Sequence, residues 1–189
     1  MDETDEQLLG WSKVGDSAAF IELFWRHGSA VHAYLARRTG RQDADDLLSE
    51  VWLRAFKSRT NYDCRYADAR PWLYGIARNV LRAHWSQTAR PLAFTEEAVA
   101  IDPWSDADRR LDAAAQVELL RPILATLSED EREVLLLVVW EQLTPAEAAV
   151  TLGIPQGTAR SRLHRALSAL RCEVGADSSV LNRLYPKEA

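Results

Sequence analysis

The stretch Thr144–Leu170, TPAEAAVTLGIPQGTARSRLHRALSAL, predicts two helices joined by a tight turn. Its first residue is a typical helix N-cap, Pro145 suits the first helical position, and Glu147 completes a capping box. Gly153 is expected to end this short helix, because glycine readily adopts the left-handed backbone found at helix C-termini. The chain can then begin a second helix at Gln156.

This second helix is predicted to have one apolar face and one basic face. Apolar residues recur at helical spacing and are expected to face a core: Ala159, Leu163, Ala166, Leu167 and Leu170. The opposite face carries the polar side chains of Thr158, Arg160, Ser161, His164 and Arg165. Four arginines and no carboxylate occur between Ala148 and Cys172. A helix–turn–helix offers its second helix to the DNA major groove in this way. An ordinary helical hairpin with a solvated basic face is the alternative, but the capping box, the turn glycine and the single sign of charge favour DNA.

Composition and charge restrict the function further. The chain of 189 residues suits one or two small domains, and nearly every segment reads as helix, so the predicted fold class is all-α. A net charge of −5 argues against a protein that coats DNA unaided, and favours a DNA reader brought to its site by a larger partner. The two cysteines form no CxxC pair, the N-terminus is acidic, and no apolar run is long enough for a membrane span. These features predict a cytoplasmic protein without membrane insertion.

Two small helical domains joined by a flexible linker are expected. Residues 1–90 contain four predicted helices, whose starts are marked by Thr4, Asp16, Asp43 and Pro71. Residues 91–112 are acidic and poorly periodic, which is typical of a linker. Residues 113–172 resume helical character and end in the helix–turn–helix, and residues 173–189 form a polar tail.

Two segments of the first domain allow more than one interpretation. The third helix, expected from Ala44 to about Lys57 with Asp43 as its N-cap, carries many charged residues, and a solvated face over a core helix would explain them. The segment 58–69 has no clean period and contains basic and aromatic residues, among them Arg59, Asn61, Tyr62, Arg65 and Tyr66. Such a loop suits stacking on an unpaired base. A surface loop with one or two buried tyrosines is the alternative.

Three segments resemble the extracytoplasmic-function, or group IV, sigma factors of the sigma-70 family. DADDLLSEVWLRAF (43–56) resembles region 2.2 and RPWLYGIARNVLRAH (70–84) resembles regions 2.3 to 2.4 of that family. The longer segment LSEDEREVLLLVVWEQLTPAEAAVTLGIPQGTARSRLHRAL (127–167) resembles region 4. The matches occur in the family's order and cover roughly residues 10–172. The resemblance implies an alternative sigma factor that binds core RNA polymerase and directs promoter-specific transcription initiation by recognising −35 and −10 elements and stabilising promoter melting.

The resemblance also implies roles for individual residues. Docking on the clamp helices of the polymerase β′ subunit is implied for Asp45, Asp46, Leu47, Glu50 and Arg54. Contact with the −10 element is implied for Asn61, Tyr62, Arg65, Tyr66, Arg78, Asn79 and Arg82. The resemblance also implies that residues 62–68, called the −10 loop below, capture a flipped base of the −10 element. Contact with the −35 element is implied for Thr158, Arg160, Ser161, His164 and Arg165. The implied partners are core RNA polymerase, through its β′ clamp helices and β flap, promoter DNA and an anti-sigma factor.

No catalytic residue, metal site or cofactor is expected. The sequence lacks a Gly-rich phosphate loop, a cluster with metal-ligand spacing and a nucleophile–base arrangement. An enzyme using His84 or Cys64 is one alternative, but neither residue has a credible catalytic partner in the sequence. A stand-alone helix–turn–helix regulator is the other alternative. The net charge and the helices that resemble region 2 argue against it.

Overall fold

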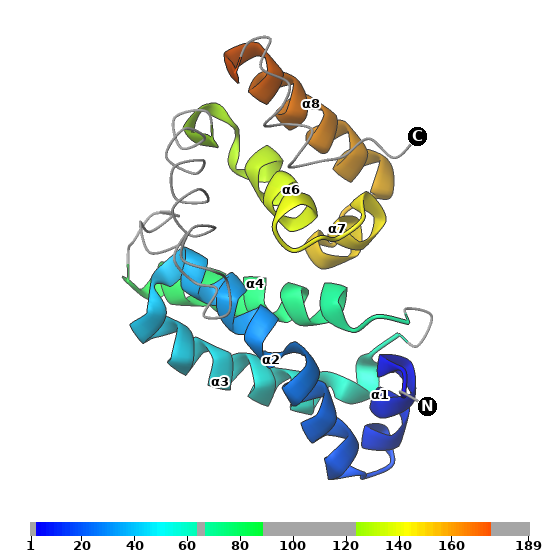
Figure 1. The fold of residues 1–189 in the computed structure, drawn as a ribbon. Helices are drawn as coiled ribbons and strands as arrows, with labels where there is room; N and C mark the ends of the chain where they lie inside the picture. The colour runs from blue at the N-terminus through cyan, green and yellow to red at the C-terminus, as the bar shows by residue number, and fades with distance from the viewer. Residues whose placement is uncertain (1–2, 64–66, 89–123, 175–189) are drawn as a thin grey trace, which may run out of the picture. The chain divides into compact units, whose positions relative to one another are not determined.

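The computed structural model of the chain describes residues 3–63, 67–88 and 124–174. All regular elements in these ranges are helices, which confirms the predicted all-α fold class. The chain divides into two compact units, Met1–Ser105 and Asp106–Ala189 (Figure 1). The predicted linker 91–112 lies outside the described residues, and so does the predicted tail 173–189 except for residues 173–174, which end a helix. Among the residues that the structure describes, no helix combines the length and the apolar character that crossing a membrane requires.

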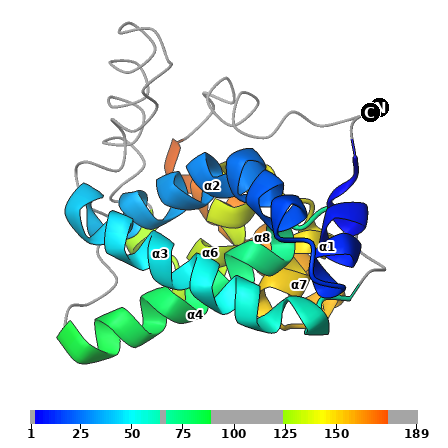
Figure 2. The same cartoon turned by 90° about the horizontal axis from the view of Figure 1, so that it is seen from below.

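The N-terminal unit packs three long helices against one another. Its elements are α1 (Asp5–Lys13), α2 (Ser17–Thr39), α3 (Arg41–Ser58), the short 3₁₀ helix η1 (Arg59–Asn61) and α4 (Arg70–Thr88). α2 contacts α1, α3 and α4, and α3 also packs along α4 (Figure 2). α1 contacts η1 as well. The start of the chain therefore lies beside the segment that connects α3 to α4.

The core of this unit is built from the facing sides of the long helices. The buried apolar residues come from all three and include Leu23, Leu35, Val51, Leu73 and Leu81. An aromatic cluster joins α2 to α3, since Phe20 and Phe24 both pack edge-on against Trp52 at centroid distances of 5.7 and 5.2 Å. Such pairs add to the stability that burial of the rings provides. The core of this unit therefore lies between α2, α3 and α4.

Capping signals set the first two helix starts as predicted. Thr4 and Gln7 form a capping box at α1, in which each side chain bonds the backbone N–H of the other. The Asp16 carboxylate accepts the N–H groups of Ala18 and Ala19 at the start of α2 (2.9 and 3.2 Å). These bonds satisfy backbone donors that have no partner inside the helix.

The predicted N-cap of the third helix is wrong. α3 begins at Arg41 rather than Ala44, and no side chain caps it. Gly40, at φ 86°, ends α2 and lets the chain turn directly into the next helix, and its carbonyl accepts the N–H of Ala44 (3.2 Å). Asp43 instead lies in the first turn of α3, where its charge complements the helix dipole, and its carboxylate lies 3.6 Å from the imidazole of His84.

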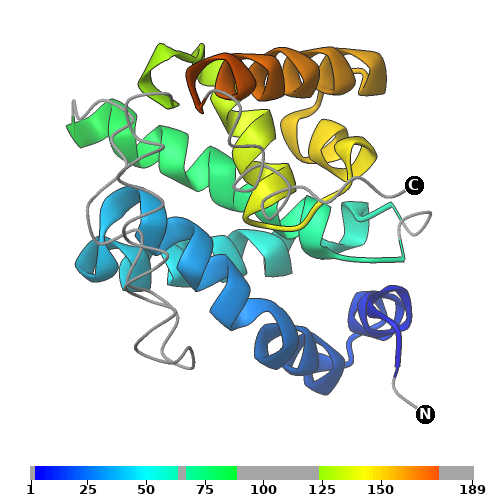
Figure 3. The same ribbon diagram turned by 45° about the horizontal axis from the view of Figure 1, so that its top comes forward.

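The C-terminal unit contains the helix–turn–helix. Its elements are α6 (Glu129–Val139), α7 (Pro145–Leu152) and α8 (Gln156–Val174), and α8 packs on both of the others (Figure 3). The predicted capping box of Thr144 and Glu147 is present. Gly153 ends α7 in the left-handed conformation at φ 65°, as expected. The turn between α7 and α8 is thus positioned by residues close to it in the sequence.

The predicted inner face of α8 is buried. Four of its apolar residues have almost no exposed surface, namely Ala159, Leu163, Ala166 and Leu170. Leu167 is half-buried at the edge of this face. The same core takes buried residues from α6 and the segment that follows it, including Val134, Leu137 and Leu143. Burial of this face fixes which side of α8 points outward.

Candidate nucleic-acid and polymerase interfaces

The outward side of α8 carries the residues predicted to read the −35 element. Thr158 is half-buried, and the other four are exposed: Arg160, Ser161, His164 and Arg165. The helix has no carboxylate between its start at Gln156 and Arg171. The structure therefore brings the five predicted residues together on successive turns of one helix, with a single sign of charge.

Two arginines of α8 are tied to the first turn of α6. Arg165 donates from Nε to Oε1 of Glu131 (2.6 Å), and a terminal nitrogen of Arg162 donates to Oδ2 of Asp130 (2.5 Å). The hydrogen bond from the Ser128 side chain, followed by that from Arg165, lowers the pKa of Glu131 below its usual value. The side chain of Arg165 is still 60% exposed. α6 therefore orients this arginine without burying it.

The outward side of α3 contains most of the residues predicted to dock on the polymerase. Asp45 and Asp46 are exposed, and Glu50 pairs with Arg54 one turn further along (Oε1–Nε 2.6 Å). Leu47 differs, because it is only 9% exposed and belongs to the core. Its side chain contributes little to the outer surface of the free chain, and its role in docking stays a prediction.

Two apolar residues without a predicted surface role also lie on the outside of α3. Leu53 is 48% exposed and Phe56 is 40% exposed. Leu53 follows Asp46 after two helical turns and therefore shares its side of the helix. An exposed leucine among carboxylates is a candidate protein-docking residue. A helical projection of the segment 43–57 centred on Asp46 would have identified it from the sequence.

The first residue of the −10 loop is buried. Tyr62 is 4% exposed, its ring packs edge-on against Trp72 at a centroid distance of 5.2 Å, and its hydroxyl donates to the carbonyl of Asp68 (3.3 Å). Lys13 of α1 donates to the Tyr62 carbonyl (2.9 Å). The alternative of a buried tyrosine therefore holds for Tyr62. Stacking of this ring on a base would require it to leave its present contacts.

The other residues predicted to contact the −10 element differ in position. Asn61 ends η1 and is exposed. On α4, Asn79 and Arg82 are exposed and Arg78 is half-buried, and helical spacing places the three on one side of the helix. The structure does not describe Arg65, Tyr66 or Cys64. The described members of the set thus lie at the end of η1 and along α4.

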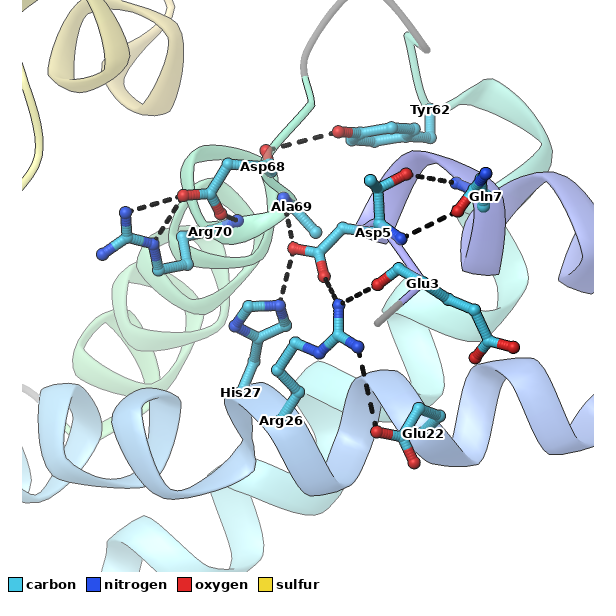
Figure 4. Close-up of polar contacts among 11 residues, drawn as sticks. Glu3, Asp5, Gln7, Glu22, Arg26, His27, Tyr62, Asp68, Ala69 and Arg70 are labelled. Atoms are coloured by element: carbon cyan, nitrogen blue, oxygen red, sulfur yellow. Dashed lines mark hydrogen bonds and ion pairs between the residues drawn. The ribbon is translucent and has the colours of Figure 1, made fainter. Parts of the chain in front are cut away.

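A buried acidic residue, Asp5, joins α1, α2 and the start of α4 (Figure 4). Its Oδ2 accepts hydrogen bonds from Nε2 of His27 (2.7 Å) and from the N–H of Ala69 (2.9 Å), and its Oδ1 accepts one from Arg26 (2.7 Å). Burial opposes ionisation of Asp5, but the bonds from His27, Ala69 and Arg26 outweigh it and lower the pKa from 3.8 to about 2. The carboxylate is therefore ionised at neutral pH.

The same residues form a grouping with the spacing of a metal site. Ligand atoms of Asp5, His27 and Asp68 all lie within 4.8 Å of one another. These carboxylates already have cationic partners, since Arg26 pairs with Asp5 (2.7 Å) and Arg70 with Asp68 (2.6 Å). Two guanidinium groups oppose the entry of a further cation. The grouping is therefore explained as a hydrogen-bond network.

Comparison with known families gives matches to both units. Residues 23–90 match the family described as Sigma-70 region 2, and residues 118–170 match Sigma-70, region 4. The first match covers most of α2 together with α3 and α4, and the second covers the whole helix–turn–helix. The two families occur in the order predicted from the sequence.

Relatives that align along most of the chain are also named as RNA polymerase sigma factors. The chain is 35% identical over 134 residues to the "Probable RNA polymerase sigma-C factor" of Mycobacterium bovis, covering 71% of each chain. It is 30% identical over 158 residues to the "ECF RNA polymerase sigma factor SigL" of Mycobacterium tuberculosis, covering 82% of this chain and 89% of the relative. It is 31% identical over 173 residues to SigM of the same organism, covering 89% and 84%.

Two solved structures share the fold. "Structure of CnrH in complex with the cytosolic domain of CnrY" matches with a TM-score of 0.64 and 24% identity, covering 92% of this chain and 99% of that one. The sigma factor RpoE, in complex with the anti-sigma factor NepR from Bartonella quintana, matches with a TM-score of 0.60 and 21% identity, covering 84% and 98%. The family matches, the curated relatives and the helical architecture together show that the chain belongs to the extracytoplasmic-function sigma factors of the sigma-70 family.

Proposed function

We propose that this sigma factor acts through three surfaces when it directs RNA polymerase to a promoter. The outward side of α3 docks on the β′ clamp helices of core polymerase. The −10 loop and the outward side of α4 hold the melted −10 element, and α8 reads the −35 element. The observation that carries the proposal is the exposed face of α8, which has several cationic side chains and no carboxylate and lies opposite a buried apolar face.

The first proposed surface explains how an acidic protein can act on DNA. With a net charge of −5, the chain has little long-range attraction for phosphates, and the polymerase supplies it instead. Asp45, Asp46, Glu50 and Arg54 give the docking surface its charges. Leu53 adds apolar area among them. Burial of this side chain on docking would remove apolar surface from water, which favours binding.

The second proposed surface stabilises promoter melting by binding alone. Capture of an unstacked base offsets part of the few kcal/mol, roughly, that unpairing costs. Asn61, Asn79 and Arg82 are exposed and able to contact the strand or its phosphates. Tyr62, which is buried, acts in this scheme as a support for the loop. The step needs no catalytic group, and the protein is proposed to be a non-catalytic initiation factor.

The third proposed surface reads duplex DNA. Arg160, His164 and Arg165 project from successive turns of α8, within reach of neighbouring base pairs. An arginine that is bidentate to guanine contributes about 1–3 kcal/mol of discrimination. Glu131 holds Nε of Arg165 and so limits the directions that this guanidinium can take. Sequence preference at the −35 element is the expected result.

An anti-sigma factor is the third proposed partner, after core polymerase and promoter DNA. RpoE of Bartonella quintana forms a complex with the anti-sigma factor NepR, and CnrH with the cytosolic domain of CnrY. A comparable partner would cover the docking side of α3 and thereby compete with the polymerase. Addition of the partner should then release the sigma factor from core polymerase.

Reconstituted transcription tests the proposed function. Core polymerase with the chain should initiate at a defined set of promoters, with −35 and −10 elements upstream of the mapped start sites. The chain without core polymerase should not shift the same DNA in a gel. A specific shift by the free chain, together with no effect on initiation by core polymerase, would favour the stand-alone regulator instead.

A further inference from the structure

Helix α1 contacts both ends of the −10 loop. At the first end, Lys13 donates to the carbonyl of Tyr62 (2.9 Å), and Nε of Arg59 in η1 donates to the carbonyl of Ser12 (3.1 Å). At the second end, Oδ2 of Asp5 accepts the N–H of Ala69, the residue that precedes α4 (2.9 Å; Figure 4). One short helix is therefore bonded to the first residue of the loop and to the residue that directly follows it.

The bond to Ala69 is the most constrained of these contacts. Asp5 is 6% exposed, and the same carboxylate holds His27 and Arg26 of α2. Its removal would leave a buried amide and a cationic partner without this acceptor, which is costly inside a protein. α1 and α2 thus fix where α4 begins.

The two ends of the loop are also joined to each other through Asp68. The carbonyl of Asp68 accepts the hydroxyl of Tyr62, and the Asp68 carboxylate accepts the backbone N–H and Nε of Arg70 (2.8 and 2.7 Å). The ends of the loop are therefore tied to each other, to α1 and, through Asp5, to α2. None of these bonds uses a residue predicted to contact DNA except Tyr62, which is buried.

We propose that Asp5 and Lys13 are positioning residues for recognition of the −10 element. They set the separation and orientation of Tyr62 and of the first turn of α4. Asn79 and Arg82 lie further along α4, so the position of its first turn also determines theirs. Neither Asp5 nor Lys13 contacts DNA in this scheme. The inference rests on the proposed role of the −10 loop and α4, and it assigns to α1 a part in promoter opening for which its sequence carries no signal.

The proposal also separates two roles that the same bonds could have. A purely structural role would weaken core docking and the −10 step together, because both surfaces belong to the N-terminal unit. A positioning role changes the −10 step selectively, because core docking uses α3 and −35 reading uses α8. Readouts for the three surfaces therefore distinguish the two explanations.

The test uses holoenzyme reconstituted from core polymerase and the full chain. The variants are Asp5→Asn and Lys13→Met, with Glu6→Gln as the matched control, because Glu6 lies in the same first turn of α1, carries the same charge and is exposed. Four quantities are measured: core affinity, −35 preference on a randomised library, −10 preference on a second library, and the fraction of open complexes reported by 2-aminopurine in the −10 element.

We expect Asp5→Asn to reduce the fraction of open complexes about tenfold, which corresponds to the loss of one buried hydrogen bond. The variant should also have a weaker sequence preference at the −10 element. Core affinity and −35 preference should stay at the parent values, and Glu6→Gln should match the parent throughout. Lys13→Met should act in the same direction with a smaller effect. If circular dichroism shows that Asp5→Asn does not fold, Lys13→Met decides by the same readouts.

Two results would overturn the inference alone. One is an unchanged −10 preference and open-complex fraction in a folded variant, and the other is a parallel loss of core affinity and opening. A parent holoenzyme without any −10 preference would overturn the proposed role of the −10 loop, and the inference with it. The parent measurement therefore separates failure of the proposed function from failure of the positioning role.

Discussion

The two DNA-facing regions of this sigma factor are built in different ways. In the C-terminal unit, the turn that presents α8 depends on Thr144, Glu147 and Gly153, which lie within ten residues or so of one another. In the N-terminal unit, the start of α4 depends on Asp5, which lies 64 residues before the amide that it accepts. The first region is specified locally, and the second by a contact between distant parts of the chain.

This difference has consequences for stability. A locally capped turn loses only the cap when one residue changes, because the remaining bonds of the helix are intact. Substitution of a buried ionised residue breaks several bonds at once, because the Asp5 carboxylate accepts hydrogen bonds from His27, Arg26 and Ala69. Substitutions in the two regions should therefore differ in size and in how far their effects spread.

The largest effect is expected for Asp5→Asn. Breaking this buried network should lower the free energy of unfolding of the N-terminal unit by about 3 kcal/mol. Hydrogen exchange should accelerate in α1, α2 and α4 but not in α8, and Glu6→Gln should leave all four helices unchanged. Equal acceleration in α8 would show that the two units do not unfold independently. It would then contradict the distinction between a locally specified C-terminal unit and an N-terminal unit that depends on Asp5.

Acid should reproduce part of this loss. The pKa of Asp5 is about 2 in the folded chain against 3.8 for the free group. Between these values the unfolded chain binds more protons, so stability rises with pH. The contribution, about 2 kcal/mol, is complete above about pH 5 and is lost progressively as the pH falls through the folded pKa of about 2. Denaturant melts of the parent and of Asp5→Asn at several pH values should converge at low pH, and curves that stay parallel would contradict the assignment.

Leu53→Asp should weaken the affinity for core polymerase by about 2 kcal/mol, roughly thirtyfold, if docking buries this side chain. Val14→Asp is the matched control, since Val14 is an equally aliphatic and even more exposed residue outside α3. Competition binding with labelled parent protein measures both. Equal affinities for the two variants would remove Leu53 from the docking surface.

The smallest effect is expected for Thr144→Ala. Loss of the N-cap should cost the C-terminal unit about 1 kcal/mol, with faster exchange in α7 and no change in α1 to α4. Thr144→Ser keeps a hydroxyl that can accept the N–H of Glu147 and should restore the parent value. A cost equal to that of Asp5→Asn would contradict the distinction between local and long-range specification.

Local signals account for what the sequence predicted well. The capping residues of α1, α2 and α7, the turn glycine and the inner face of α8 all act within about one or two helical turns, where spacing determines contact. The start of α3 was missed because Gly40 joins two helices directly, with no cap for Asp43 to provide.

The surfaces were predicted less completely, for reasons that lie outside local spacing. Leu47 lies directly beside the exposed Asp45 and Asp46 in the sequence, and only the packing of α3 against α2 and α4 decides that its side chain is buried. The sequence allows the Tyr62 ring either to stack on a base or to pack in the core, and only its contact with Trp72 in the folded chain decides between the two. Asp5 belongs to an acidic terminus in the sequence, and its partners come from α2 and α4. Long-range contacts of this kind have no periodicity to reveal them.

The central claim is that the outward face of α8 reads the −35 element. Its most direct test is initiation by reconstituted holoenzyme on a library randomised across that element, with Arg160→Ala, His164→Ala and Arg165→Ala compared with Arg171→Ala, an exposed arginine of the last turn. We expect each of the first three to relax the preference at one or two positions, by about 1–3 kcal/mol for an arginine that contacts guanine, and Arg171→Ala to keep the parent's preference. If all three variants also keep it, α8 does not read the promoter and the account is wrong.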